Sequence, residues 1–241
     1  MPPEFEIRRE VELPATPEQV WAAVATGDGT AAWMFPTAAG APRGTGEIFA
    51  GHTVTAFDPP WHLAVRAEGP DGWFNALEYR VEARDGGTVV LRYVHSGVFV
   101  EDWDNQYDAA SQHTDFYLHT LGQYLRYFAG RRATYVAAQG PGKSTAKGAF
   151  DPVRHALRLT GPAQAGDRVR LDLPDADPLD GELDYLTPNF IGVRTADGLY
   201  RFFGRNAFGM PVGLGHHLFA PDADADRAQR TWQAWLDGLY R

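Results

Sequence analysis

The Gly-Lys-Ser triplet within GPGKST, residues 140–145, is the stretch of this sequence that most resembles a phosphate-binding loop. Such a loop needs G-x-x-x-x-G-K-[ST] after a buried parallel strand, so that successive backbone N–H groups surround the phosphates. The position of the first glycine is occupied by Ala137, and Pro141 removes one N–H donor. We therefore predict a turn or linker at the start of a second structural unit, not a nucleotide site.

Two acidic runs and an adjacent histidine pair are the candidate metal ligands. In DADPLDGE, residues 175–182, the third aspartate comes one position too late for a calcium loop and the distal glutamate is missing, which favours a hairpin turn. The run EDWDNQYD, residues 101–108, is predicted to cap a long helix. His216 and His217 are neighbours on a predicted strand, so they point to opposite faces and do not chelate one ion. The sequence thus predicts no metal site and no cofactor.

A more promising group combines polar and aromatic side chains on strands that alternate between two faces. On the predicted inner face, Asn75, Tyr79, Tyr93 and His95 form a polar cluster among aromatic residues, which suits recognition of a small amphipathic molecule. His95 has two interpretations: a histidine that is hydrogen-bonded near a strand end, or a polar anchor for a ligand. No G-x-S-x-G motif occurs and no carboxylate pair falls on the inner faces, so no catalytic residue is assigned.

Composition narrows the class of protein further. The 241 residues are 44% hydrophobic and 13% aromatic, which is enough for a sizeable core. The net charge is −9 without a basic block, which argues against nucleic acid or an anionic membrane as a partner. The chain has no cysteine, and it lacks both an apolar signal core and a run of about 18 apolar residues. We expect a cytoplasmic protein that does not insert into a membrane.

Hydrophobic periodicity places these residues on an antiparallel sheet that is covered by a helix. Period-two alternation predicts strands over 5–13, 46–50, 52–57, 61–68, 73–83 and 88–96. Between the first two strands, a helix should begin at Pro17 after the N-cap Thr16 and end at Gly27 and Gly29, with a further helical turn over 31–34. A stripe of apolar residues at helical spacing then predicts a long helix over 108–129.

The second half looks like a shorter repeat of the first. Strand-like segments follow from 134 onwards, 150–159 reads as either helix or strand, and an amphipathic helix ends the sequence. The apolar stripe of this last helix repeats that of the helix over 108–129, displaced by 111 residues. We predict two α+β units, residues 1–132 and 133–241.

Four segments carry a resemblance to a known superfamily: REVELPATPEQVWAAVA, FDPPWHLAVRAE, TVVLRYVHSGVF and FYLHTLGQYLRYFAGR. Together they resemble the START-like, Bet v 1-like (SRPBCC) superfamily, in its branch of bacterial proteins named after the activator of Hsp90 ATPase (AHSA1). The resemblance implies a helix-grip fold, in which a C-terminal helix closes a curved antiparallel sheet over a cavity, here as a tandem pair with a degenerate second copy. Family members often have Gly-Trp before the closing helix's FxL segment. This sequence has His113-Thr114 there, so one cavity wall should differ.

The resulting prediction is a non-catalytic protein that binds a small hydrophobic or aromatic molecule between the sheet and the long helix. The predicted ligand-binding residues are Trp61, Trp73, Asn75, Leu77, Tyr79, Tyr93, His95, Tyr117 and Leu121. Two alternatives stay open. One is an interaction module with a protein partner, such as a chaperone regulator. The other is a cyclase- or hydrolase-type enzyme that uses His95.

Overall fold

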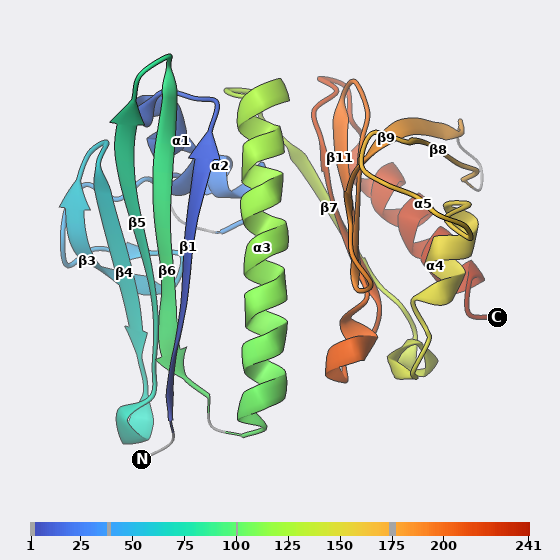
Figure 1. Cartoon of the computed structure of the whole chain (residues 1–241), viewed down its shortest axis with the longest axis horizontal. Coiled ribbons are helices and arrows are strands. Elements are labelled where there is room, and N and C mark those ends of the chain that lie inside the picture. The colour runs from blue at the N-terminus through green and yellow to red at the C-terminus, as the bar shows by residue number, and fades with distance from the viewer. Residues whose placement is uncertain (1–2, 38–39, 100, 174–176) are drawn as a thin grey trace. The chain divides into compact units, whose positions relative to one another are not determined.

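The structure, a computed structural model, describes residues 3–37, 40–99, 101–173 and 177–241. The chain divides into two compact units, residues 1–132 and 133–241, each with its own six-stranded antiparallel sheet (Figure 1). Within the described residues, no helix is both long and apolar enough to cross a bilayer.

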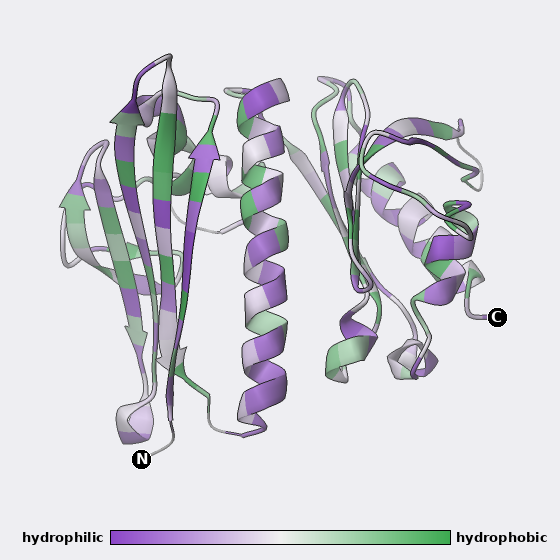
Figure 2. Cartoon of the chain, viewed as in Figure 1, coloured by the Kyte–Doolittle hydropathy of each residue, from purple (hydrophilic) through white to green (hydrophobic). Residues whose placement is uncertain are grey.

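The first sheet has the strand order β1-β6-β5-β4-β3-β2, so the first and last strands of the unit are neighbours. Its strands are β1 (Glu4–Leu13), β2 (Ile48–Phe49), β3 (His52–Asp58), β4 (His62–Glu68), β5 (Phe74–Arg84) and β6 (Thr88–Val98). The alternation that predicted these strands is visible along them as polar and apolar bands (Figure 2). The predicted strands match closely except β2, which forms only at residues 48–49.

Cross-strand pairing fixes which side chains share the inner face. Ile7 on β1 and Leu77 on β5 both pair with His95 on β6, so all three point to the same side. One row further along, Arg9 and Tyr79 both pair with Tyr93. In the other direction, Phe5 and Asn75 both pair with Gly97.

Helix α1 (Pro17–Val24) begins as the sequence predicts. The Thr16 hydroxyl accepts from the Gln19 N–H, the Gln19 side chain accepts from the Thr16 N–H, and Pro17 takes the first helical position. The predicted end at Gly27 and Gly29 is wrong, because α1 ends at Val24. The predicted further turn is present as a second helix, α2 (Gly27–Ala31), which begins four residues earlier than predicted and whose turn hydrogen bonds continue to Met34. Gly29 allows α2 to approach α1 closely, since a Cβ at this position would lie 2.0 Å from the Ala22 carbonyl oxygen.

Helix α3 (Trp103–Tyr127) lies along β1 and closes the first unit (Figure 1). It starts five residues before the predicted position at 108. The run 101–108 therefore supplies the first turns of the helix and not only its cap. The residue before the helix, Asp102, has φ = 46° and makes no side-chain capping bond, so the expected carboxylate cap does not form.

The second unit repeats this topology, with a shorter closing helix and several shorter strands. Its sheet order is β7-β12-β11-β10-β9-β8, and helix α5 (Ala225–Gly238) packs against β7. The strands are β7 (Thr134–Gln139), β8 (Arg168–Leu171), β9 (Leu179–Leu186), β10 (Phe190–Arg194), β11 (Gly198–Phe203) and β12 (Gly213–Leu218). The ambiguous segment around 150–159 contains a helix, α4 (Asp151–Ala156).

The ends of the two long helices show how the repeats correspond. Helix α5 ends 111 residues after α3, the same displacement as that of the apolar stripes. Under this correspondence Ala225, the first residue of α5, matches Thr114. Residues 103–113 of α3 then have no counterpart in the 14-residue α5, and the six-residue β11 and β12 are likewise much shorter than the 11-residue β5 and β6.

The GPGKST stretch follows a strand that a phosphate loop does not use. β7 pairs antiparallel with β12, and residues 142–145 form a single 3₁₀ turn with Ser144 fully buried.

The acidic run 175–182 was predicted to form a hairpin turn. Asp175 lies outside the described residues, while Asp180 and Gly181 belong to β9 and not to a turn. Gly181 is required there, because a Cβ would lie 2.6 Å from Val193 Cγ1 on the neighbouring strand.

Candidate functional site

The inner face of the first unit opens at the end where β1 begins and β6 ends. A hollow of about 520 Å³ lies there, and the residues that line it are Phe5, Trp73, Asn75, Val98, Phe99, Glu101 and Gln106. The sheet contributes the start of β1 and β5 and the end of β6, and the first turn of α3 contributes Gln106. Three aromatic rings, two amides and one carboxylate therefore surround a space large enough for a small molecule.

Phe5 separates this opening from His95. Its ring stacks on Phe99 with a centroid distance of 3.9 Å and meets the His95 ring edge-on at 4.9 Å. The position of Phe5 depends on Gly97, its partner on β6, because a Cβ at that residue would lie 2.8 Å from Phe5 Cε1. A glycine inside a strand thus makes room for the aromatic ring that covers the histidine.

His95 is a half-buried, neutral side chain. Burial lowers its pKa to about 4, and the nearby charge of His52 acts in the same direction. Its buried Nε2 has no hydrogen-bond partner within the described residues. Of the two interpretations of His95 that the sequence left open, the hydrogen-bonded one does not hold for this nitrogen. A polar atom without a partner remains beside the opening.

Two tyrosines continue the inner face beyond His95. The rings of Tyr79 and Tyr93 lie 5.2 Å apart, and burial raises the pKa of both hydroxyls. The Tyr93 hydroxyl also bonds the side chain of Thr114, which is 5% exposed. Thr114 belongs to the His113-Thr114 pair at which this sequence departs from the family pattern, so the departure supplies the partner of an inner-face tyrosine.

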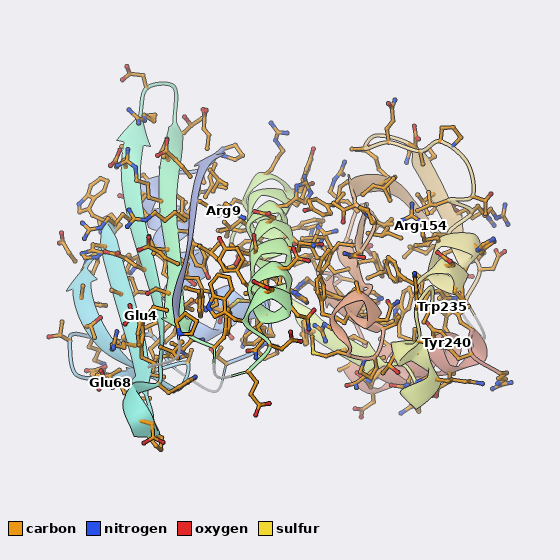
Figure 3. All side chains as sticks on the ribbon, turned by 60° about the horizontal axis from the view of Figure 1, so that its bottom comes forward. Glu4, Arg9, Glu68, Arg154, Trp235 and Tyr240 are labelled. Atoms are coloured by element: carbon orange, nitrogen blue, oxygen red, sulfur yellow. The ribbon has the colours of Figure 1, made fainter. Side chains whose placement is uncertain are left out.

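Arg9 joins β1 to α3 at the level of these tyrosines (Figure 3). Its guanidinium donates from Nε to Asp115 Oδ1 at 2.5 Å and from Nη2 to Ser111 Oγ at 2.8 Å. The hydrogen bond with Asp115 raises the pKa of Arg9. The one basic residue of the inner face of β1 is therefore already neutralised by a carboxylate from the helix.

The predicted site residues do not all lie together. Trp73 and Asn75 line the opening, whereas Trp61 precedes β4 in a turn and is 43% exposed. Leu121 is fully buried in the second half of α3, and Tyr117 contacts Phe35 and His113. The remaining predicted residues, Leu77, Tyr79, Tyr93 and His95, share the inner face of β5 and β6.

Sequence reasoning missed five residues that line the opening: Phe5, Val98, Phe99, Glu101 and Gln106. Phe5 falls within the strand predicted over 5–13, but no local signal shows that β1 begins beside the start of α3. Phe99 and Glu101 follow β6, where strand alternation has ended. The usable signal was Gly97, since a glycine within an otherwise β-branched and aromatic strand indicates close approach of another group.

The histidine pair of the second unit belongs to its core. His216 accepts a hydrogen bond from the Arg201 N–H and contacts the ring of Trp232 at 4.1 Å, while His217 contacts Tyr135. Burial lowers the pKa of His216 well below its usual value. A separate hollow of about 410 Å³ lies in this unit beside Tyr200, Trp232 and Thr231.

Other parts of the described structure offer less to a ligand. A hollow of about 370 Å³ along β1 and α3 is rimmed by Glu12, Asp115 and Arg126, whose charges are solvated or paired with a neighbour. Among the described residues, no three histidine or carboxylate side chains gather closely enough to hold a metal ion. The opening at Asn75 is therefore the candidate site.

No family model matches the sequence, and no curated protein does. Several solved structures do match the chain. The Aha1 dimer from Colwellia psychrerythraea is 20% identical over 50% of this chain and 96% of its own, with a TM-score of 0.41.

Two further solved structures match nearly the whole chain. The di-domain ARO/CYC BexL from the BE-7585A biosynthetic pathway is 14% identical over 95% of this chain and 93% of its own, with a TM-score of 0.43. DynU16, a protein of the dynemicin biosynthetic locus, is 15% identical over 99% of this chain and 97% of its own, also with a TM-score of 0.43. The strand order and closing helix of the first unit are those of the predicted α+β helix-grip fold.

Proposed function

We propose that the first unit binds a small aromatic molecule, without transforming it, through the opening lined by Phe5, Trp73, Asn75 and Gln106. One observation carries the proposal: Gln106, which lines the opening, lies in the part of α3 that has no counterpart in α5 of the second unit. The short strands and helix of the second unit complete the same sheet topology. The extra length of the first unit is therefore not needed to close the fold.

The additional residues frame the opening directly. Gln106 belongs to residues 103–113, the part of α3 without a counterpart in α5, and Val98 ends the longer β6. Trp73 and Asn75 stand at the start of the longer β5. An extension that is dispensable for the topology but surrounds a hollow is best explained by a ligand.

Two polar groups near the opening support the same conclusion. The half-buried Asn75 amide lines the opening, and the buried Nε2 of His95 has no hydrogen-bond partner in the described part of the chain. Leaving a buried polar atom unsatisfied costs about 1–3 kcal/mol. A ligand that reaches His95 when the Phe5 ring moves would recover part of this cost.

The expected affinity is moderate. Burying roughly 250 Å² of apolar ligand surface at about 25 cal/mol per Å² contributes about 6 kcal/mol before the costs of ordering. This corresponds to a dissociation constant on the order of tens of micromolar. Such affinity is measurable by titration calorimetry with a soluble probe such as 2-naphthol.

Filling the opening tests the proposal. Asn75→Trp places an indole in the hollow, and we expect it to weaken 2-naphthol binding at least tenfold while leaving the circular dichroism spectrum unchanged. Thr231→Trp is the matched control, because Thr231 lines the hollow of the second unit and its substitution should leave binding unchanged. Equal loss in both variants, or no binding by the natural chain, would refute the proposal.

A further inference from the structure

We propose that this opening selects uncharged, hydroxyl-bearing fused aromatic molecules and rejects carboxylates of the same shape. The inference rests on the proposed function and adds the chemical class of the ligand. It follows from three features of the lining: the rings, the charges and the hydrogen-bonding groups that are available to a ligand.

The rings favour a flat ligand. Phe5 and Phe99 already form a parallel stack, with planes 3° apart, at the inner end of the opening. Trp73, the residue before β5, also lines the hollow. A fused aromatic ring gains more from stacking among these three side chains than a flexible alkyl chain does, because it loses little conformational freedom on binding.

The charges disfavour an anion. Glu101 supplies the one formal charge among the described lining residues, and it is negative. Arg9 lies on the same face of β1 two rows from Phe5, but its guanidinium is bonded to Asp115 and Ser111. His95, behind Phe5, is neutral. A carboxylate that entered would lose its water and meet no free cation, which is costly.

The hydrogen-bonding groups favour a hydroxyl. The Asn75 amide offers both donors and an acceptor, and a ligand hydroxyl can use either. The same holds for His95, because a hydroxyl can donate to a bare ring nitrogen or accept from a protonated one. A carbonyl serves only a donor. The hydroxyl therefore suits the site whichever tautomer His95 adopts.

The test compares three naphthalene probes that differ in one substituent. With the full chain at pH 7.5, we expect 2-naphthol to bind at least tenfold more tightly than 2-naphthoate and several-fold more tightly than naphthalene. If 2-naphthoate binds as tightly as 2-naphthol, the selectivity is wrong while the proposed function stands. If none of the three probes binds, both the selectivity and the proposed function are wrong.

A charge variant locates the selectivity. Glu101→Gln should raise 2-naphthoate affinity two- to threefold, because it removes the one formal charge among the described lining residues; the gain is small because Glu101 is exposed and solvent screens its charge. Asp85→Asn is the matched control: it removes the same charge from the exposed turn that joins the far ends of β5 and β6. If both variants shift 2-naphthoate binding equally, net charge governs selectivity and the assignment to Glu101 is overturned.

Discussion

The Phe5 ring covers the His95 imidazole edge-on, with 4.9 Å between the ring centroids. This contact places an apolar side chain between a half-buried, neutral histidine and the opening of the first unit. It exists because residue 97, directly opposite Phe5 on β6, is a glycine. The first prediction concerns that glycine.

Gly97→Ala should destabilise the first unit by about 1–3 kcal/mol, because overpacked sites shift their neighbours. The new Cβ would lie 2.8 Å from Phe5 Cε1 and 2.7 Å from the Phe74 carbonyl oxygen. Urea unfolding measures the loss. Gly122→Ala on α3 is the control: its Cβ meets only Leu13 Cδ2 at 3.7 Å, so the variant should gain up to about 1 kcal/mol from helix propensity. A stability unchanged in Gly97→Ala would contradict the close packing of Phe5.

Removing one partner of the Tyr93–Thr114 hydrogen bond should cost more than removing both. Thr114→Val leaves the buried Tyr93 hydroxyl without its partner, at a cost of about 1–3 kcal/mol. Adding Tyr93→Phe removes the stranded hydroxyl and should restore most of the loss. Urea unfolding measures both variants. A double variant with the same free energy of unfolding as Thr114→Val alone would show that the two hydroxyls do not act as a pair.

The ion pair between Arg9 and Asp115 should contribute modestly, because both side chains are partly exposed. A double-mutant cycle with Arg9→Met and Asp115→Asn should give a coupling of about 1 kcal/mol that declines with added salt. Arg8→Met is the comparison: Arg8 pairs with Glu6 on the exposed face, where we expect almost no effect on stability. A larger loss of stability in Arg8→Met than in Arg9→Met would argue against a stabilising ion pair between β1 and α3.

Acid should destabilise the first unit through His95. In the unfolded chain this histidine titrates near its ordinary pKa of 6.5, whereas burial lowers the folded pKa to about 4. As pH falls from 6.5 to 4, the unfolded chain binds more protons than the folded chain, so the free energy of unfolding decreases. The loss is at most about 3 kcal/mol.

Comparing natural chain and His95→Asn isolates this contribution, since other buried groups such as His216 titrate in both. The difference in unfolding free energy between the two proteins should be constant above pH 7 and should shrink as pH falls toward 4. A difference that does not change with pH would mean that His95 is not buried as a neutral base.

Local signals in the sequence were enough for the elements themselves. The capping box of Thr16 and Gln19 marked the start of α1, and alternation placed β3 to β6 within two residues. These features depend on neighbouring residues and on which face of a strand is buried, which a sequence records directly. Asn75, Tyr93 and His95 were assigned to one face for the same reason.

The tertiary structure decided what the sequence left open. Gly29 reads as a helix end, yet it lies within a second helix. A glycine is needed there because α1 approaches it too closely for a side chain. The opening joins Phe5 to Gln106, about a hundred residues apart in the chain, and Arg9 meets Asp115 over a similar separation. Local pattern determines which face a residue takes. Only the register of β1 on β6 and the path of α3 along β1 decide which faces meet, and therefore where a ligand could bind.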